Sequence, residues 1–477
     1  RLQGRRQTAG IKEMFTRGPP GVAIARQFKH RPRHLMCLRL FFFLLCAASA
    51  TATIAGAEKS TPPNVLLIIS DDQAWGDYSF LGQPPIKTPH LDELAGESLT
   101  YTRGYVAAPL CRPSLASIFT GKYAHAHGIT GNDPRVPPGR KGDRRNPELR
   151  QLYETIMTRI SEEPGLAHLL GSAGYLSLQT GKWWEGDPKK RGGFSHAMTH
   201  GDPDRGGRHG YAGLRISRQV INPINDFLAE ARQKKKPFFL WHAPFLPHTP
   251  HNPPERLFKK YRAQSPSRFI ARYWAMCEWF DETCGELLAR IDEEGLRENT
   301  IVLYVTDNGW IQSADSGRYA ARSKRSPNEG GVRTPIMIRW PRVIAQKFDE
   351  TTLVSSIDLA PTILKACGLP VPASMPGIDL RDRAALIKRN AVFGASYAHD
   401  ILDVTHPNLS LQTRYLVSGQ WKLLAHRGSG TTAQKLELYD IIADPAEKRD
   451  LAPQRPGELK RLSAALDAWW PGPPSGP

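Results

Sequence analysis

Short, continuous apolar runs that recur along the chain constrain its fold more than any other feature. The first run, residues 64–70, reads Asn-Val-Leu-Leu-Ile-Ile-Ser and is followed at once by Asp71 and Asp72. A strand that is buried on both faces has this composition, and such strands belong to parallel sheets covered by helices. Three further runs share the pattern: residues 237–242, 300–306 and 334–340.

Helical stretches lie between these runs. We predict helices at residues 90–97, 113–120, 221–232, 268–293 and 358–367. The alternation of strand and helix favours an α/β fold with a mostly parallel central sheet sandwiched by helices. The 477 residues suffice for one large domain, or for a large and a small one.

The pattern of apolar and polar residues changes after about residue 385. Short alternating segments there predict a smaller C-terminal subdomain with an antiparallel sheet, closed by a helix at residues 456–470. We therefore expect three parts: an upstream segment with a leader (1–57), a large domain (60–385) and the C-terminal subdomain with its tail (386–477).

Positive charge is concentrated at the start of the chain. The formal net charge is +18, and residues 1–57 hold ten Lys/Arg against one acidic residue, Glu13. Basic residues precede the apolar run at 40–48 and small residues follow it, which is the pattern of a secretory signal peptide too short to span a bilayer. This placement predicts a secreted or periplasmic protein without stable membrane insertion, and argues against nucleic acid as a partner.

Two polar pairs follow strand-like runs. Asp71 and Asp72 end the first run, and Asp307 and Asn308 end the run at 300–306. In open α/β sheets, ligands collect at the carboxyl ends of strands. An isolated Asp most often caps a turn or helix. Two such pairs after two similar strands favour instead an all-oxygen site for Ca²⁺ or Mg²⁺.

Cys111 lies where a loop enters a helix. Residues 110–121 read Leu-Cys-Arg-Pro-Ser-Leu-Ala-Ser-Ile-Phe-Thr-Gly. A proline at a helix start, with free backbone N–H groups beside it, places Cys111 at a site suited to anions. A buried structural cysteine is the common alternative, and no Cys/His signature of a thiol protease surrounds this residue. Cys277 and Cys284, about two helical turns apart, are predicted as core thiols.

The segment at Cys111 resembles the signature of the sulfatase family, C-x-P-S-R followed by a small, apolar helix and T-G. Other segments resemble sulfatase motifs in the same order along the chain: 64–72 the first strand with its aspartate pair, 87–92 the TPNLD helix start, 181–184 the GKWH segment, 247–250 the PHTP loop, 306–309 the second metal segment, 329–335 the EGGxRxP turn and 438–445 the LYDL ending. These matches cover nearly all of residues 64–451.

The resemblance implies hydrolysis of sulfate esters by a formylglycine that a maturation enzyme makes from Cys111. It also implies a bound divalent cation, Ca²⁺ in preference to Mg²⁺. Four side chains are thereby assigned to the cation: Asp71, Asp72, Asp307 and Asn308. Lys182, His248 and Lys324 would contact the sulfate or the leaving oxygen. Either His248 or Lys324 would protonate the leaving alkoxide.

The chain departs from the family pattern at two positions. Leu115 stands where the family has an arginine that holds the formylglycine and belongs to the maturation signal. Trp184 stands where the family has the histidine expected to act as base when the aldehyde is regenerated. Arg112 and Arg103 are candidate substitutes for the arginine. Candidates for the base are five histidines and a glutamate: His125, His127, His196, His200, His209 and Glu185.

Residues 192–215 are rich in Gly, His, Asp and Arg. Together with Trp183 and Trp184 they favour a loop that binds a sulfated sugar, with a solvated connecting loop as the equal alternative. We therefore expect a sulfated carbohydrate as substrate in preference to a small aryl sulfate. Two other functions stay open: a phosphodiesterase or phosphonate monoester hydrolase of the same superfamily, and a non-catalytic protein that binds sulfated glycans.

Overall fold

The computed structural model describes residues 61–82, 85–136, 146–162, 164–202, 215–428 and 434–473. The segment predicted as a leader (1–57), His209 and half of the predicted sugar loop at 192–215 lie outside these residues. The stretch Lys59–Pro477 forms one compact unit. Within the described ranges, no helix combines the length and apolarity needed to cross a membrane.

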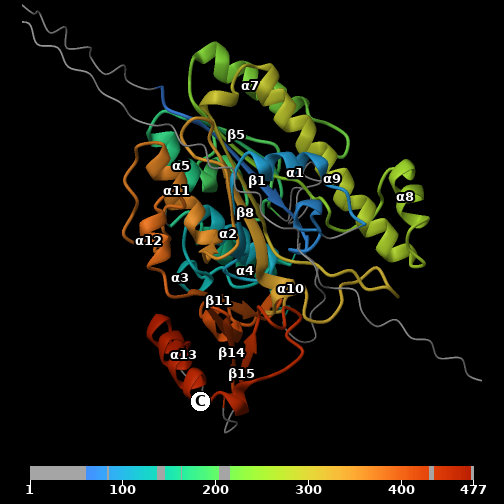
Figure 1. Cartoon of the computed structure of the whole chain (residues 1–477). Coiled ribbons are helices and arrows are strands. Elements are labelled where there is room, and N and C mark those ends of the chain that lie inside the picture. Colours follow the sequence, from blue (N-terminus) through green and yellow to red (C-terminus); the bar gives the residue numbers. More distant parts are fainter. Residues whose placement is uncertain are drawn as a thin grey trace, which may run out of the picture. The chain divides into compact units, whose positions relative to one another are not determined.

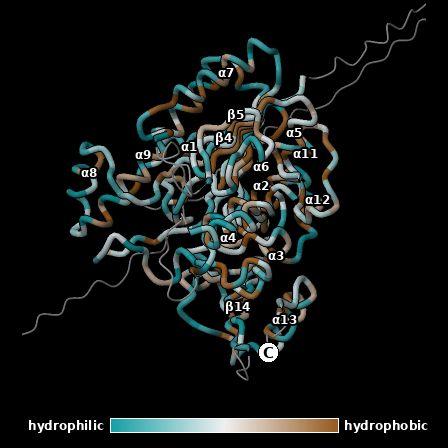
Figure 2. The backbone as a smooth tube through the Cα atoms, turned by 180° about the vertical axis from the view of Figure 1, so that it is seen from behind, coloured by the Kyte–Doolittle hydropathy of each residue, from teal (hydrophilic) through white to brown (hydrophobic). Residues whose placement is uncertain are grey.

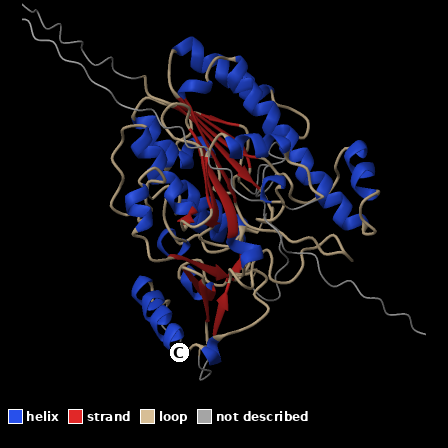
Figure 3. Ribbon diagram, in the orientation of Figure 1, coloured by secondary structure: helices blue, strands red, loops and turns tan. Residues whose placement is uncertain are grey.

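A nine-stranded sheet forms the centre of this unit, in the order β10-β2-β8-β7-β1-β6-β4-β5 with β9 paired to β2 (Figures 1 and 3). Its pairs are parallel except those that β8 makes with β7 and β2, which confirms the predicted mostly parallel sheet. The strands are β1 (Asn64–Ser70), β2 (Leu99–Tyr105), β4 (Leu176–Gly181), β5 (His196–Ala197), β6 (Phe238–Ala243), β7 (Thr300–Thr306), β8 (Arg333–Arg339), β9 (Lys347–Asp349) and β10 (Val354–Ser355).

Helices cover both faces of the sheet, as predicted. Alternate residues of β1 point to opposite faces because a strand has a period of two. Val65 and Leu67 join one apolar cluster with α2, α5 and α11, whereas Leu66 and Ile68 join another with α1, α7 and α9. In Figure 2 the strands around β4 are mostly brown, while α7 also carries many teal residues. These helices are α1 (Pro89–Gly96), α2 (Cys111–Thr120), α5 (Leu166–Ser172), α7 (Asn222–Lys234), α9 (Arg268–Glu293) and α11 (Leu359–Ala366).

Helix α9 has the bounds that the sequence predicts. The Ser267 side chain caps its N-terminus by accepting a hydrogen bond from the Ile270 N–H. Cys277 and Cys284 are buried, free thiols on this helix, which confirms that they belong to the core. Shorter helices complete the unit: α3 (Ala124–His127), α4 (Pro147–Thr158), α6 (Pro188–Gly192), α8 (Glu255–Arg262), α10 (Glu329–Val332) and α12 (Arg383–Ile387).

The C-terminal strands form the predicted antiparallel sheet, in the order β11-β13-β14-β15. Helix α13 (Pro456–Trp469) packs on it through Leu462 and Leu466. A short parallel pair, β12 (Asp400–Ile401) with β3 (Asp133–Pro134), joins this part of the chain to the loop that follows α3. The four strands are β11 (Val392–Tyr397), β13 (Leu411–Ser418), β14 (Trp421–His426) and β15 (Leu436–Asp440).

A buried ion cluster also connects the C-terminal sheet to the large sheet. Lys422 on β14 lies 3.0 Å from a carboxylate oxygen of Glu329 and 3.2 Å from one of Glu447, and all three side chains are buried. Glu447 in turn accepts a hydrogen bond from the Glu329 N–H at 2.6 Å. Glu329 begins α10, so this cluster holds the short helix that follows the Lys324 loop.

Candidate active site

The carboxyl ends of β1 and β7 bring the two polar pairs together. These strands are parallel and in register, with Ser70 opposite Thr306, so the residues that follow them start at the same level of the sheet. The Asp72 N–H donates a hydrogen bond to Asp307 Oδ1 at 3.2 Å, and Asn308 Nδ2 donates one to Asp72 Oδ1 at 2.6 Å. The sequence-based expectation that both pairs meet at one edge of the sheet therefore holds.

Asp72 turns the chain sharply after β1. Its φ of 64° lies in the left-handed region, which Asp tolerates better than most residues do. In a continuing strand, Asp71 and Asp72 would point to opposite faces. The turn lets both carboxylates serve one polar network, and both are buried.

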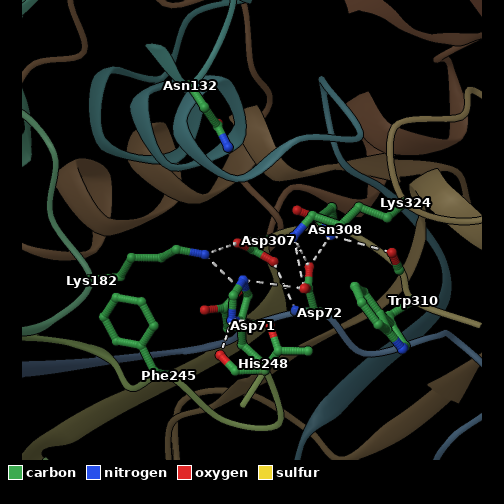
Figure 4. A network of polar contacts seen from close by, with 12 residues as sticks. Asp71, Asp72, Asn132, Lys182, Phe245, His248, Asp307, Asn308, Trp310 and Lys324 are labelled. Carbon is green, nitrogen blue, oxygen red and sulfur yellow. Dashed lines mark hydrogen bonds and ion pairs between the residues drawn. The ribbon is translucent and has the colours of Figure 1, made fainter. Parts of the chain in front are cut away.

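Two lysines neutralise part of this charge. Lys182 Nζ lies 2.7 Å from Asp71 Oδ1 and 3.4 Å from Asp307 Oδ2, and Lys324 Nζ lies 2.7 Å from Asp72. Figure 4 shows the two lysines reaching the aspartates from opposite sides. The carboxylates outweigh the effect of burial and raise the pKa of both ammonium groups, so both stay charged.

Gly181 places Lys182 at the end of β4. Its φ is +77°, and a Cβ at this position would lie 1.9 Å from the carbonyl oxygen of Ala243 on β6. Only glycine fits there. The Lys182 N–H donates to the same carbonyl at 2.7 Å, so the close approach of the two strands determines where the lysine side chain starts.

Cys111 is the first residue of α2 and is only 1% exposed. Its sulfur lies in a group with ligand atoms of Asp71, Asp72 and His248, all within 4.8 Å of one another. Burial raises the pKa of the thiol to about 12, although Lys182 and Lys324 act in the opposite direction. An unmodified Cys111 is therefore a protonated thiol at neutral pH, and a poor nucleophile.

Burial and neighbouring charges shift the pKa values of the three aspartates. Burial raises the pKa of Asp71, and burial together with Asp71 raises that of Asp307 to about 7. For Asp72, burial is outweighed by Lys324, His248 and Lys182, which hold its pKa at about 2. Two buried oxygens, Asp71 Oδ2 and Asn308 Oδ1, have no hydrogen-bond partner among the described residues. Unpaired oxygens beside crowded carboxylates fit a hard divalent cation.

Charge counting supports the same assignment. When all three carboxylates are ionised, as cation binding requires, they and the two ammonium groups leave one negative charge in a buried site. A divalent cation would turn this into one positive charge, which a monoanionic ester then neutralises. Buried charges are stable only when they are compensated in this way.

The two positions that depart from the family pattern face one small cavity. Leu115 and Trp184 both line it, together with Lys182 and Arg112. An arginine and a histidine have thus been replaced by two apolar side chains that lie near each other.

Neither arginine proposed as a substitute takes the place of the missing one. Arg112 makes a buried, two-pronged ion pair with Glu185 at 2.6 and 2.7 Å and donates to the Asn132 carbonyl at 3.1 Å. Arg103 donates to the carbonyl of Gly419 in the C-terminal sheet. Arg112 instead fixes the loop around Cys111, because the Arg112 N–H also donates to Asn132 Oδ1.

Most candidates for the missing base lie away from Cys111. Four histidines have other partners: His125 stacks on Trp470, His127 bonds Ser117, His196 pairs with Glu230 and His200 with Asp187. Glu185 lies nearer but is held by Arg112. In the described part of the chain, the histidine grouped with Cys111 is His248, whose Nε2 is 3.4 Å from Asp72.

The prediction that Trp183 and Trp184 form a sugar-binding wall is wrong. Each is only 4% exposed, and Trp183 packs in the core against Phe119 and Trp241. The ring of Trp184 lies 5.5 Å from Lys182 Nζ. A large apolar side chain that follows a buried strand packs into the protein interior, even when it lies close to a site residue in the sequence.

Sequence reasoning missed a larger pocket that opens beside His248 and Lys324. Five of its lining residues were not singled out from the sequence: Trp310, Arg318, Tyr319, Arg325 and His399. Four of them lie close in sequence to Asn308 or Lys324, and this proximity could have indicated them as pocket residues. His399 follows β11 in the C-terminal part, and no sequence pattern connects it with the site.

This fold places a buried cluster of carboxylates and lysines, which fits a divalent cation, at the carboxyl end of a mostly parallel α/β sheet. The chain belongs to the sulfatase family: the Sulfatase family model matches residues 63–369, and a model described as N-sulphoglucosamine sulphohydrolase, C-terminal, matches residues 317–466. It is a sulfuric ester hydrolase.

Known relatives match over most of the chain. An ulvan-active sulfatase of Formosa agariphila is 26% identical over 91% of this chain and 85% of its own length. Human arylsulfatase A is 26% identical over 87% of this chain and 90% of its own. The crystal structure of Ps i-CgsB shares the fold, with a TM-score of 0.67 and 23% identity over 86% of this chain and 93% of that one.

Proposed function

We propose that this enzyme hydrolyses sulfate esters of carbohydrates, using a formylglycine made from Cys111 and a divalent cation, Ca²⁺ in preference to Mg²⁺. The observation that carries the proposal is the buried group in which Cys111 lies among acidic side chains and two charged lysines. The relative named as active on ulvan, and the C-terminal match to a sulphoglucosamine sulphohydrolase, support a sugar substrate.

The cation would be held by oxygen atoms of four residues: Asp71, Asp72, Asp307 and Asn308. When bound, it polarises a sulfate oxygen and the nucleophile and so favours attack on sulfur. Without it the aspartates would face the anionic sulfate directly, with no cation between them. Removal of divalent ions by a chelator should therefore abolish sulfate release, and added Ca²⁺ should restore it.

The hydrated aldehyde at position 111 would supply one hydroxyl that attacks sulfur and a second through which sulfate is released. Lys182 and Lys324 offset the charge that develops on the sulfuryl oxygens. Lys324 or His248 donates a proton to the leaving oxygen. His248, grouped with Cys111, then takes the proton from the second hydroxyl, in place of the histidine that Trp184 replaces.

The first test is the mass of the tryptic peptide spanning residues 104–122, from protein made beside a maturation enzyme. A mass reduced by conversion of the Cys111 thiol to an aldehyde supports the proposal and shows that Leu115 permits maturation. An unmodified thiol in every host contradicts the formylglycine mechanism.

The second test compares ester classes. Sulfated oligosaccharides, an aryl sulfate, a phosphodiester and a phosphonate monoester are assayed with the mature enzyme. We expect the highest kcat/KM for a sulfated oligosaccharide. Faster cleavage of the phosphorus esters would favour the alternative hydrolase of the superfamily, and cleavage of the aryl sulfate alone would contradict a sugar substrate. The apolar leader-like run supports a site of action in the periplasm or outside the cell, which fractionation of the native host tests.

A further inference from the structure

The pocket beside the site is basic. It has a volume of about 600 Å³, and its wall includes Arg318, Arg325 and His399 in addition to Lys324. Among its lining residues that the structure describes there is no aspartate or glutamate. Lys324 is compensated by Asp72, so the positive charge of the outer wall comes from the two arginines.

The backbone of Arg325 is held by a hydrogen bond, and its side chain has no polar partner among the described residues. Its N–H donates to the carbonyl of Pro109 at 2.8 Å, two residues before Cys111, and its φ is 69°. The side chain is exposed and makes no hydrogen bond or ion pair with any described residue. A turn tied to the nucleophile loop therefore presents a guanidinium group beside Lys324.

Arg318 is presented in a similar way. Its carbonyl accepts hydrogen bonds from Gln312 Nε2 and from the Ser313 N–H, both at 3.0 Å, which holds the loop. Its side chain is exposed and likewise has no polar partner among the described residues. Across the pocket, His399 is oriented by Asp400, with Nδ1 2.6 Å from Oδ1.

An aromatic pair lies between these groups and the inner site. The rings of Trp310 and Tyr319 are 5.2 Å apart, and Lys324 Nζ lies 5.6 Å from the Trp310 ring. Trp310 Nε1 is satisfied by Gln312 at 3.1 Å. An aromatic surface flanked by cationic groups suits a sugar ring that carries anionic substituents.

We propose that the substrate carries a second anionic group next to the sulfate ester that is cleaved, and that Arg325 and Arg318 bind this group. The inference rests on the proposed function, because the cation and a monoanionic ester leave the inner site neutral and the arginine charges uncompensated. Guanidinium groups bind carboxylates, and also sulfate groups, through paired hydrogen bonds. The second anion is therefore a uronate carboxylate or a second sulfate ester on a neighbouring position.

The test uses three versions of one oligosaccharide: with a single sulfate, with the sulfate and a uronate, and with two sulfates. The wild-type mature enzyme should prefer at least one dianionic version, and Arg325→Gln should lower that preference by about tenfold, mainly through KM. Arg318→Gln is a second variant, in case the first folds poorly. Arg342→Gln is the control, because Arg342 is an exposed arginine with a φ of 63°, close to that of Arg325, and it should leave the preference unchanged.

Preference for the uronate or for the disulfate supports the inference and identifies the anion. Equal kcat/KM for all three versions overturns it, and so does an Arg325→Gln variant that slows all three by the same factor. Calorimetric titration of a Cys111→Ala variant with the same saccharides measures their dissociation constants, and so tests the preference for a second anion without turnover. If the dianionic saccharides bind selectively but no sulfate is released by the mature enzyme, the proposed function fails, while the assignment of Arg325 and Arg318 as an anion-binding pair stands.

Discussion

Single side chains around Cys111 depend on one another through charge. Lys182 is the clearest case, because it lies between Asp71 and Asp307 and is only 1% exposed. Lys182→Met removes one of two compensating charges and leaves buried carboxylates unpaired.

We expect Lys182→Met to lower the rate of sulfate release by roughly 100-fold or more. In metal-free buffer it should also lower the free energy of unfolding by about 3–5 kcal/mol. Added Ca²⁺ should recover part of this stability, because the cation compensates the same carboxylates. Lys365→Met is the control, since Lys365 is exposed on α11. Thermal melts with and without Ca²⁺ check the expectation, and equal melts for both variants would contradict it.

His248 carries a different prediction. If it is the base that completes each turnover, His248→Gln should release about one equivalent of phenol per active site from an aryl sulfate and then stop with the sulfate still bonded to residue 111, since this leaving group needs little protonation. Rapid-mixing kinetics measure the burst. The control, His196→Gln, alters a histidine paired with Glu230 and should turn over steadily. Steady turnover by His248→Gln would assign the base elsewhere.

The eight residues that the sequence predicts for the site lie close together in the structure, and their roles stay predictions. Asp71, Asp307 and Lys182 follow strand ends, whereas Cys111, His248 and Lys324 reach them from a helix start and from loops. Sequence-based prediction was wrong for Trp183 and Trp184, which are buried, and it missed Arg318 and Arg325. Their positions come from long-range loop contacts, such as the bond between Arg325 and Pro109, which no local pattern records.

Among the elements, the end of β4 gives a direct steric prediction. Gly181→Ala combines a positive φ with a Cβ 1.9 Å from Ala243 O, whereas Gly174→Ala has a φ of +88° and no atom within 4 Å. The control should therefore cost only the backbone strain, about 1 kcal/mol. Gly181→Ala should cost more and should reduce activity by moving Lys182. Chemical denaturation and kcat measure both effects, and equal costs would show that the two strands separate easily.

Helix α9 also supports the start of α1. Asp281 is buried and accepts hydrogen bonds from the N–H groups of Leu91 at 2.7 Å and His90 at 3.2 Å. Burial raises the pKa of Asp281 to about 7. Between pH of about 4 and 7 the folded protein thus keeps a proton that the unfolded chain has released, so this group lowers stability as the pH rises.

Asp281→Asn should remove this contribution. Relative to the wild type, the variant should gain stability between pH of about 4 and 7, measured by denaturation at constant ionic strength. Asp292→Asn, on the same helix but partly exposed, serves as the control. A constant difference between Asp281→Asn and the wild type across this range would show that the carboxyl is already ionised when folded.

Elements with a strong apolar pattern were predictable. Strand β7 and helix α9 have the predicted bounds, since the interior of β7 is wholly apolar and α9 is long and periodic. Strand β2 was missed because Thr100, Thr102 and Arg103 interrupt its apolar residues. They are tolerated because, for example, Thr100 donates to Ala95 O at 2.8 Å and Arg103 donates to Gly419 O, both of which lie outside the strand.

For the molecule as a whole, the Lys422 cluster connects the C-terminal sheet to the helix that follows the Lys324 loop. Lys422→Met removes the buried cation beside Glu447 and leaves Glu329 only its longer pair with Arg333 at 3.5 Å, which should cost about 3–5 kcal/mol. Because Glu329 begins α10, sulfate release should fall as well, although Lys422 does not line the pocket. Lys435→Met, which breaks an exposed pair on the same sheet, should change neither quantity. Full activity of Lys422→Met would show that the Lys324 loop is held by other contacts.

The burial of Cys111 also has a consequence in time. In the folded protein the Cys111 residue is 1% exposed. Lys422 can pair with Glu329 only after β14 has been synthesised. At ordinary translation speeds, roughly a quarter of a minute to a minute separates the two residues on the ribosome. The maturation enzyme that we propose for Cys111 would have that interval to reach the thiol, so slower translation or delayed folding should raise the fraction of chains that become active.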